Sequence, residues 1–426
     1  MTKMVYLSTM ILLAAPCAVG AEKVLSNELK QLGYFVEGTR SGRVFFYSEK
    51  PFDGPFTEGV PPAIPSDTDL AAAYRANLCL RTADRVYICL ARFEAREFDV
   101  LFEGVRAIPW QHWFRKDVRV VVDKVRTHKS RLESEHSIQG VVHKAIYTRL
   151  GNEWKMTNLP ETGSQASVRV YLEQDEALVL LDLSGMPLHR RGYRTTGGDA
   201  PIRETLAAIL LQLMNWRRKI PLHDAFCGSG TIALEAMLYA HNIAPGLSRS
   251  FALETLQPFT TASVKERMVK VRQDAVLSIR TDCLVRISGS DIDPNILVAA
   301  RANAERAGAI AGRALMECGN RSQIARPSFF QASFDELASS SHRSRFPDEG
   351  LFLSNPPYGE RLGDSESALA LYAAMRSLPV SFPDWEFGLI TSHKDFERAY
   401  GRRADKKKTL KGGNLETCLY MYTKER

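Results

Sequence analysis

Four consecutive residues, Asn355-Pro356-Pro357-Tyr358, have the composition of a binding site for an aromatic amine. They directly follow an apolar run at 351–354, which predicts a buried strand. Prolines have a fixed φ and no backbone N–H, so the turn is stiff and rich in acceptors. Backbone carbonyls and the Asn355 side-chain oxygen can accept both hydrogens of an exocyclic amine and direct its lone pair at an electrophile. The ring of Tyr358 can stack on a base, which contributes about 1–3 kcal/mol. We predict that these four residues are catalytic.

A second segment, Asp224–Thr231, joins an acid to a glycine-rich turn. Gly228 and Gly230 allow a ligand to approach the backbone closely, and the helix expected at 232–239 offers free N–H groups. The segment lacks the Lys-Ser/Thr of a phosphate P-loop and the spacing of a dinucleotide GxGxxG motif. A tight turn without a ligand is the alternative, but the acid at a strand end favours a ligand site. The cofactor residues predicted here are Asp224, Phe226, Cys227, Gly228, Gly230 and Thr231.

A third segment places two acids after an expected strand at 285–290. Asp291, at the strand end, is the candidate for binding ribose hydroxyls, as acids do in nucleotide-binding folds. Asp293 precedes Pro294 and is predicted to cap the following helix. Capping alone is the alternative for both acids.

The elements that carry these residues alternate between strand and helix from residue 200 onward. Strand-like runs precede Asp224, Asp291 and Asn355, and apolar periodicity predicts a helix at 203–216. This alternation predicts a doubly wound α/β domain, in which ligands bind at the carboxyl ends of the strands.

The preceding part of the chain has a different pattern. A proline-rich connection at 51–68 precedes a helix expected at 69–80, and two apolar runs at 167–172 and 177–182 predict a hairpin. This part therefore predicts a separate α+β region.

The first 22 residues resemble a secretory signal, with Lys3, an apolar run and small residues before position 22. The same residues also predict a strand at 10–15, a helix at 22–32 and a strand at 42–47. Because the three elements are continuous, we favour a folded N-terminus, a cytoplasmic protein and a translation start near Met10. No other apolar run is long enough for a membrane span.

Charge and cysteine content restrict the classes of partner. The 426 residues carry a net charge of +7, and residues 392–426 contribute +5, from ten Lys/Arg and five Asp/Glu. A basic tail is compatible with a phosphate-bearing partner, although from charge alone a solvated face is the better explanation. The seven cysteines form no CxxC pair or zinc-ligand spacing, which favours a reducing compartment and no structural metal.

These motifs resemble a known family. Segments 224–231, 289–294 and 355–362 are similar to the bacterial 23S rRNA guanine-N2 methyltransferases with a THUMP domain, of the RlmL type. Further similar segments, in the same order along the chain, are 75–84, 101–104, 185–194, 242–246 and 404–408.

The resemblance implies three domains: a ferredoxin-like segment at 1–62, an RNA-binding THUMP domain at 65–187 and a Rossmann-like methyltransferase domain at 196–426. It also implies S-adenosylmethionine as cofactor and RNA as partner, either 23S rRNA or its precursor, or tRNA. Asp224, Gly228 and Gly230 would hold the methionine part. Asp291, with Ile292 beside it, would hold the ribose, and 355–358 the target base.

Two residues depart from the family pattern. Ala225 stands where proline is usual, and Ser333 stands where an acid normally contacts the adenine amine. We include Ser333 among the cofactor residues, with Asp335 as the alternative adenine contact. The chain ends after one catalytic unit, which implies one activity.

The leading hypothesis is methylation of guanine N2 in 23S rRNA. The alternatives are a tRNA guanine-N2 methyltransferase, an adenine-N6 DNA methyltransferase and a non-catalytic RNA-binding assembly factor; a secreted protein ranks last. The candidate phosphate contacts are Arg191, Arg194 and Lys406–Lys408, each of which could equally be a surface charge.

Overall fold

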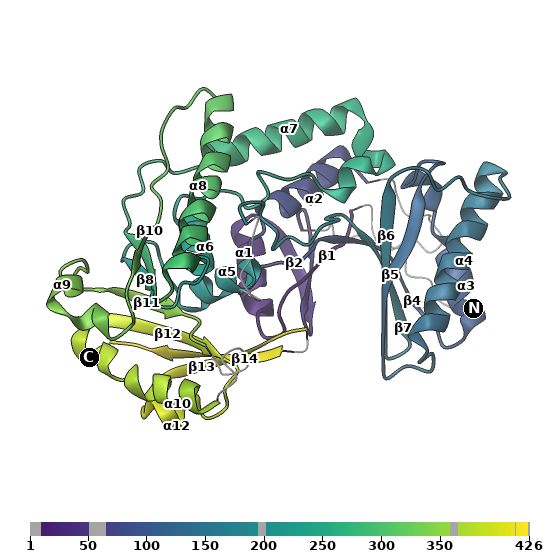
Figure 1. Ribbon diagram of the computed structural model, residues 1–426. Coiled ribbons are helices and arrows are strands. Elements are labelled where there is room, and N and C mark those ends of the chain that lie inside the picture. The colour runs from purple at the N-terminus through teal and green to yellow at the C-terminus, as the bar shows by residue number, and fades with distance from the viewer. Residues whose placement is uncertain (1–9, 51–64, 195–201, 358–364, 414, 425–426) are drawn as a thin grey trace. The chain divides into compact units, whose positions relative to one another are not determined.

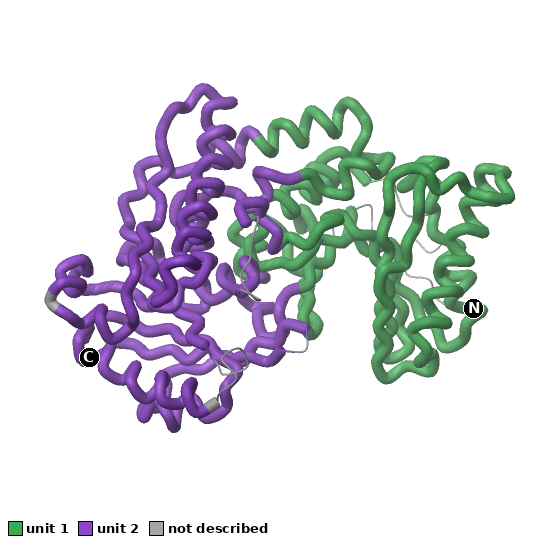
Figure 2. Tube along the Cα trace, viewed as in Figure 1, with its two compact units in different colours: residues 1–16, 26–188, 250–272 green, residues 17–25, 189–249, 273–426 purple. Residues whose placement is uncertain are grey.

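The computed structural model describes residues 10–50, 65–194, 202–357, 365–413 and 415–424 (Figure 1). Its contacts divide the chain into two compact units, shown in Figure 2. The first contains residues 1–16, 26–188 and 250–272, and the second contains 17–25, 189–249 and 273–426. Each unit is built on one seven-stranded sheet.

The sheet of the first unit has the order β2-β3-β1-β4-β7-β6-β5. Neighbouring strands are antiparallel except for β5 and β6, which are parallel. Four helices precede or connect its strands along the chain: α1 (Glu22–Gln31, which begins in the second unit), α2 (Asp67–Cys79), α3 (Phe98–Ala107) and α4 (Glu135–Trp154). The strands are β1 (Leu13–Pro16), β2 (Phe35–Arg40), β3 (Arg43–Tyr47), β4 (Tyr87–Glu94), β5 (Arg119–His128), β6 (Gln165–Glu173) and β7 (Glu176–Asp182).

The N-terminal strand lies inside this sheet. Leu13 pairs with Phe46 of β3 on one side and with Ile88 of β4 on the other. The predicted strand, helix and strand are therefore present as β1, α1 and β3, and the predicted hairpin is present as β6 and β7. Strand β2, which the sequence pattern does not predict, pairs with β3 at the edge of the sheet. Without β1, strands β3 and β4 would lose their shared partner.

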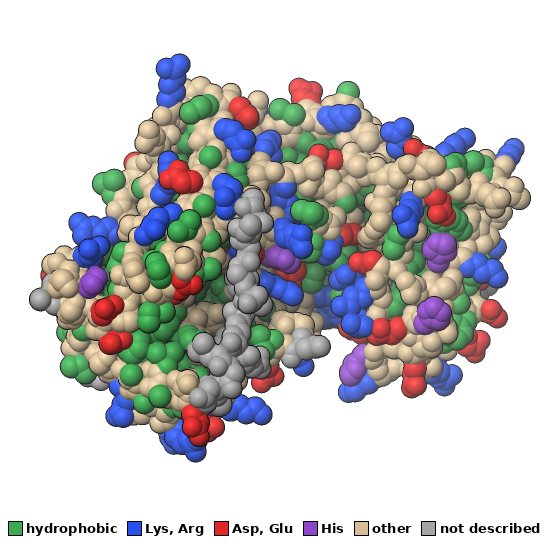
Figure 3. Space-filling view, in the orientation of Figure 1, with side chains coloured by type: hydrophobic (Ala, Val, Ile, Leu, Met, Phe, Trp, Pro, Cys, Tyr) green, Lys and Arg blue, Asp and Glu red, His purple; other side chains and the backbone are tan. Residues whose placement is uncertain are grey.

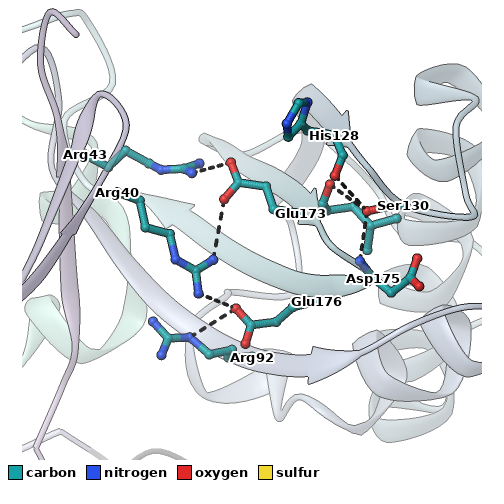
Figure 4. A network of polar contacts seen from close by, with 9 residues as sticks. Arg40, Arg43, Arg92, His128, Ser130, Glu173, Asp175 and Glu176 are labelled. Atoms are coloured by element: carbon teal, nitrogen blue, oxygen red, sulfur yellow. Dashed lines mark hydrogen bonds and ion pairs between the residues drawn. The ribbon is translucent and has the colours of Figure 1, made fainter. Parts of the chain in front are cut away.

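Ion pairs hold the two ends of this sheet together (Figure 4). Arg43 on β3 pairs with Glu173 on β6, and Arg40 Nη2 lies 2.6 Å from Glu176 Oε1 on β7. Three strands separate β3 from β6, so in a flat sheet the pair would be about 19 Å apart, four steps of about 4.8 Å. The contact therefore requires a strongly twisted, curled sheet, as the right-handed twist of strands favours.

The sheet of the second unit has the order β10-β9-β8-β11-β12-β14-β13. Strands β8 to β12 run parallel to one another, and β14, which pairs antiparallel with β12, joins β13 in an antiparallel hairpin at one edge. This arrangement confirms the predicted doubly wound α/β domain. The strands are β8 (Leu222–Asp224), β9 (Ile287–Asp291), β10 (Ser328–Gln331), β11 (Gly350–Ser354), β12 (Trp385–Thr391), β13 (Lys406–Gly412) and β14 (Leu415–Tyr422).

Helices cover both faces of this second sheet. On one face α6 and α8 pack on the first strands, and α5 packs on α6. On the other face an aromatic core that includes Phe352, Phe382 and Trp385 joins the sheet to the C-terminal helices. The helices are α5 (Glu204–Leu213), α6 (Thr231–Ala240), α7 (Ala262–Leu277, which runs from the first unit into the second), α8 (Pro294–Glu317), α9 (Ser340–Arg343), α10 (Ser365–Ala374), α11 (Ser377–Ser381) and α12 (Phe396–Tyr400).

Charged side chains of both signs cover much of the surface of the described residues. Lysine, arginine, aspartate and glutamate side chains are interspersed over the face shown in Figure 3. Within the described ranges, no helix has the length and apolar character that a membrane crossing requires.

Candidate functional site

The three predicted motifs meet at one edge of the second sheet. Strands β9, β8 and β11 are adjacent and parallel, so their carboxyl ends lie side by side. A pocket of about 370 Å³ opens there. Its lining comes from the turn after β8, the end of β9, the loop after β10 and the turn after β11. The ends of the three strands that carry the predicted motifs thus lie around one pocket.

Seven of the predicted site residues line this pocket, and five others lie close by in the chain. Asp224 ends β8, whereas Cys227, Gly228 and Gly230 form the turn that leads to Thr231, the first residue of α6. Tyr358 lies outside the described residues. The lining residues among those predicted are Phe226, Asp291, Ile292, Ser333, Asn355, Pro356 and Pro357, and the alternative adenine contact Asp335 also lines the pocket.

The glycine-rich turn is held against β9. The backbone N–H of Gly228 donates to Asp291 Oδ2 over 2.9 Å, and the N–H of Cys227 donates to the Ser290 carbonyl over 2.9 Å. Gly230 has a φ of +85°, and a Cβ atom there would lie 2.9 Å from the ring of Phe329. Any side chain at this position would therefore be strained and would push the turn from the sheet.

Asp291 is fixed but keeps capacity to bind a ligand. Its Oδ1 accepts the N–H of Asp293 over 3.1 Å, while its Oδ2 accepts from Gly228. Each carboxylate oxygen can accept a further hydrogen bond, so ribose hydroxyls remain suitable donors. Asp293 caps α8 as predicted, because its side chain accepts the N–H of Asn295 over 2.8 Å and Pro294 follows it.

Asp224 is buried at the end of β8, with 2% of its surface exposed. Its Oδ1 accepts the N–H of Phe226 over 3.1 Å. Burial raises the pKa of this carboxyl to about 7, and the nearby charge of Asp291 contributes to that rise. A buried carboxyl of this kind is stabilised in its charged form by a cation, such as the ammonium group of an amino acid.

Two charged residues lie beside the start of α6. The guanidinium of Arg194 donates to the hydroxyl of Thr231 and lies 3.5 Å from Glu204 Oε1. The other carboxylate oxygen of Glu204 is buried and has no hydrogen-bond partner in the described chain, and burial raises the pKa of this group. A buried acceptor without a partner suits a donor on a ligand. Arg194, which the sequence offers as a candidate phosphate contact, is engaged here with Thr231 and Glu204.

Arg191, another predicted phosphate contact, has a structural role. It is 3% exposed, and its Nη2 lies 3.4 Å from Glu235 Oε2. The Tyr193 hydroxyl donates to the same carboxylate over 3.0 Å. The prediction is wrong for Arg191, because the side chain is buried in an ion pair and its charge is compensated there.

Apolar side chains complete the pocket. Phe226 and Phe334 stack with ring centroids 5.9 Å apart, and Ile292 is 71% exposed at the end of β9. Ser333 donates its backbone N–H to Glu336 Oε2 over 2.7 Å. An apolar wall beside polar groups from Ser333 and Asp335 suits a flat heteroaromatic ring. Together with the acids at the strand ends, these residues fit the adenosine and amino-acid parts of S-adenosylmethionine.

The described residues show neither a cluster of metal-ligating side chains nor an activated thiol at this site. Among the described residues, no group of three or more His, Cys, Asp or Glu side chains could hold a metal ion. The thiol of Cys227 is buried, and burial raises its pKa well above the usual value, which disfavours a nucleophilic thiolate.

Comparisons with known proteins agree with this geometry. The methyltransferase domain described as RMKL-like matches residues 191–421. The RlmL ferredoxin-like domain matches residues 12–51 and 63–87, and the THUMP domain matches residues 95–182. The matches cover both units and place the predicted motifs in the methyltransferase domain.

Among curated proteins, the chain is 36% identical to "Putative RNA methyltransferase YpsC" of Bacillus subtilis, over 96% of this chain and 95% of that protein. It is 32% identical to "Ribosomal RNA large subunit methyltransferase K/L" of Cellvibrio japonicus, over 96% of this chain and 50% of that protein. The chain thus spans about half the length of the K/L relatives.

Among solved structures, SMU.472, "a putative methyltransferase complexed with SAH", is 32% identical with a TM-score of 0.80, covering 99% of this chain and 100% of that chain. A "predicted N6-adenine-specific DNA methylase" from Listeria monocytogenes is 34% identical with a TM-score of 0.80, covering 98% and 97%. TrmN from Thermus thermophilus, at 20% identity and a TM-score of 0.60, shares the fold. The chain therefore belongs to the RlmL-type family of THUMP-domain RNA methyltransferases, which use S-adenosylmethionine.

Proposed function

We propose that this protein transfers a methyl group to the exocyclic N2 amine of a guanine in 23S rRNA. The observation that carries the proposal is the Asn355-Pro356-Pro357 turn, which follows β11 and lines the pocket beside Asp291. Its acceptors suit an amine on an aromatic base. The K/L relatives, whose names give the large ribosomal RNA as substrate, favour rRNA over other nucleic acids.

When bound, S-adenosylmethionine supplies an electrophilic methyl group on a sulfonium. The chain's own residues then have to hold the reacting groups in line. In our proposal Asp291 binds the ribose hydroxyls, and Asp224 with Glu204 holds the ammonium end. Asn355 accepts one hydrogen of the target amine through its side-chain oxygen, and a proline carbonyl accepts the other. This orientation directs the lone pair of the amine at the methyl group, so that positioning supplies much of the rate.

Under this proposal each domain of the chain has its own role. Residues 65–187 would capture the RNA and residues 196–426 would carry the chemistry, with residues 1–62 as the adjoining ferredoxin-like segment. A ribosomal substrate implies a cytoplasmic location. Methylation of tRNA is the second candidate, because the turn recognises an amine and not the size of the RNA that carries it.

The decisive experiment is methyl transfer from labelled S-adenosylmethionine to unmodified 23S rRNA and to tRNA, followed by nucleoside mass spectrometry. We expect N2-methylguanosine in the large RNA with the wild-type protein and none with Asn355→Ala. Label in tRNA alone would change the substrate and keep the chemistry. N6-methyladenosine would change the target base, and no transfer to either RNA would favour an assembly factor.

A further inference from the structure

The Asn-Pro-Pro turn rests on a buried tyrosine. Tyr372 on α10 has none of its surface exposed, and its hydroxyl donates to the carbonyl of Pro357 over 2.9 Å. The same hydroxyl oxygen lies 3.0 Å from Oγ1 of Thr391, the last residue of β12. The turn that would meet the target base is thus connected to helix α10 and, through it, to strand β12.

The direction of these hydrogen bonds follows from the number of protons that each hydroxyl carries. A tyrosine hydroxyl has one proton, and Tyr372 uses it on Pro357, because a carbonyl can only accept. In the other contact Thr391 must therefore donate to Tyr372. Thr391 Oγ1 in turn accepts the backbone N–H of His393 over 3.1 Å. The bonds run one way from β12 to the turn, an arrangement in which neighbouring bonds strengthen one another.

This chain of bonds determines which acceptors are free for a substrate. Because Tyr372 is buried, the Pro357 carbonyl points into the protein core. The Pro356 carbonyl and the Asn355 side-chain oxygen are left as the acceptor pair beside the pocket. We propose that Tyr372 and Thr391 are positioning residues, which fix the Pro357 carbonyl in the core and so orient Asn355 and Pro356 toward the target amine. This inference rests on the proposed function.

A second tyrosine in the same core provides a control that distinguishes a positioning role of the Tyr372 hydroxyl from a packing role of the ring. Tyr400 on α12 belongs to the same aromatic core and is 2% exposed. Its hydroxyl is buried and has no hydrogen-bond partner within the described ranges. Removing the Tyr400 hydroxyl therefore breaks no hydrogen bond within the described residues, and Tyr400→Phe is a matched control for Tyr372→Phe.

The test compares Tyr372→Phe, Thr391→Val, the double variant, Thr391→Ser and Tyr400→Phe in the full-length protein. Loss of one buried hydrogen bond predicts a fall in kcat of about 10-fold for Tyr372→Phe and for Thr391→Val. The dissociation constant of S-adenosylmethionine, measured by calorimetry, should stay within twofold, because both residues act on the turn. The two substitutions break one chain, so the double variant should lose less than the product of the single losses. Thr391→Ser and Tyr400→Phe should keep wild-type kcat.

Equal losses in Tyr372→Phe and Tyr400→Phe would overturn the inference, as would an effect confined to cofactor affinity or melting temperature. Crystal structures of both phenylalanine variants provide a readout that does not depend on activity. The Pro357 carbonyl should turn away from its present direction in Tyr372→Phe and stay in place in Tyr400→Phe. If the wild-type protein methylates no RNA, the proposed function fails. Separately, a Pro357 carbonyl that keeps its direction in Tyr372→Phe would refute the positioning role of Tyr372.

Discussion

The hydroxyl oxygen of Ser354 accepts a hydrogen bond from the backbone N–H of Ala225 over 2.9 Å, and this contact joins the two halves of the site. Ser354 is the last residue of β11 and directly precedes Asn355. Ala225 directly follows Asp224 at the end of β8. The Ser354 side chain also hydrogen-bonds with the Asp224 carboxyl, which lowers the pKa of that group against the effect of burial. One side chain thus connects the turn proposed for the target base with the acid proposed for the cofactor.

Substitution of this serine should weaken both functions of the site. Ser354→Ala leaves the Ala225 N–H without its acceptor and Asp224 without its donor, at a cost of about 1–3 kcal/mol for each buried group. We expect the affinity for S-adenosylmethionine to fall about 10-fold and kcat to fall as well. Calorimetry gives the affinity, with Ser328→Ala at the exposed start of β10 as control. An unchanged affinity would show that Ser354 does not support the cofactor site.

Cofactor binding should release a proton near neutral pH. The pKa of Asp224 is about 7 in the free protein, mainly because of burial, so about half of the molecules carry a neutral Asp224 at that pH. A cationic ammonium partner requires the charged form. The affinity should therefore rise as the pH increases from 6 to 7.5 and level off above. Calorimetry at pH 6.5, in buffers that differ in ionisation heat, measures the proton release directly.

Asp224→Asn is the control for this linkage. It should remove the pH dependence and the proton release, and it should lower the affinity at pH 8. Because a buried carboxyl with a raised pKa destabilises the fold above its unfolded pKa, the variant should also melt at a higher temperature. A pH-independent affinity in the wild-type protein would exclude Asp224 as the partner of the ammonium group.

The strand ends were predictable from sequence because a few local signals define them. Asp224, Asp291 and Asn355 each follow a short strand-like segment, and parallel strands bring their carboxyl ends together. The hydrogen bond between Ser354 and Ala225 joins residues 129 positions apart, and no local pattern encodes such a pair. For the same reason the burial of Arg191 was missed, since its partner Glu235 lies 44 residues away. Strand β2 was missed because alternate exposed residues and Gly38 weaken its apolar pattern.

The buried histidine next to Asp224 should cost the fold stability in acid, whereas Asp224 itself, with its raised pKa, contributes in the opposite direction over the same pH range. His223 on β8 is fully buried, and its two ring nitrogens lie 2.8 Å and 3.1 Å from the hydroxyls of Ser288 and Ser290 on β9. Burial lowers its pKa to about 3, so the ring is neutral in the folded protein. In the unfolded chain the ring takes up a proton near pH 6.5.

A depressed folded pKa gives stability that is fully present above the unfolded pKa and is lost as the pH falls toward the folded one. At pH 5 the loss from His223 is about 2 kcal/mol, from 1.36 kcal/mol for each pH unit below about 6.5. Denaturant unfolding at pH 7.5 and pH 5 measures it. His223→Gln, which keeps polar contacts to the serines and does not titrate, should lose about 2 kcal/mol less between the two pH values than the wild type. An equal loss in both proteins would mean that other groups cause the acid sensitivity.

The arginine and lysine residues that the sequence offers as phosphate contacts should separate into RNA contacts and structural groups. Arg191 is buried against Glu235, so Arg191→Gln should lower the melting temperature and leave the salt dependence of RNA binding unchanged.

Lys406 is exposed on β13 and Lys408 is half-buried beside it, so both remain candidate phosphate contacts. Replacing both by glutamine should reduce the slope of log K against log salt by about 1 for each lysine that binds a phosphate. Fluorescence anisotropy with labelled RNA from 50 to about 300 mM salt measures this slope. A normal slope in the double lysine variant would remove Lys406 and Lys408 from the RNA interface, whereas a reduced slope in Arg191→Gln at unchanged stability would contradict its structural role.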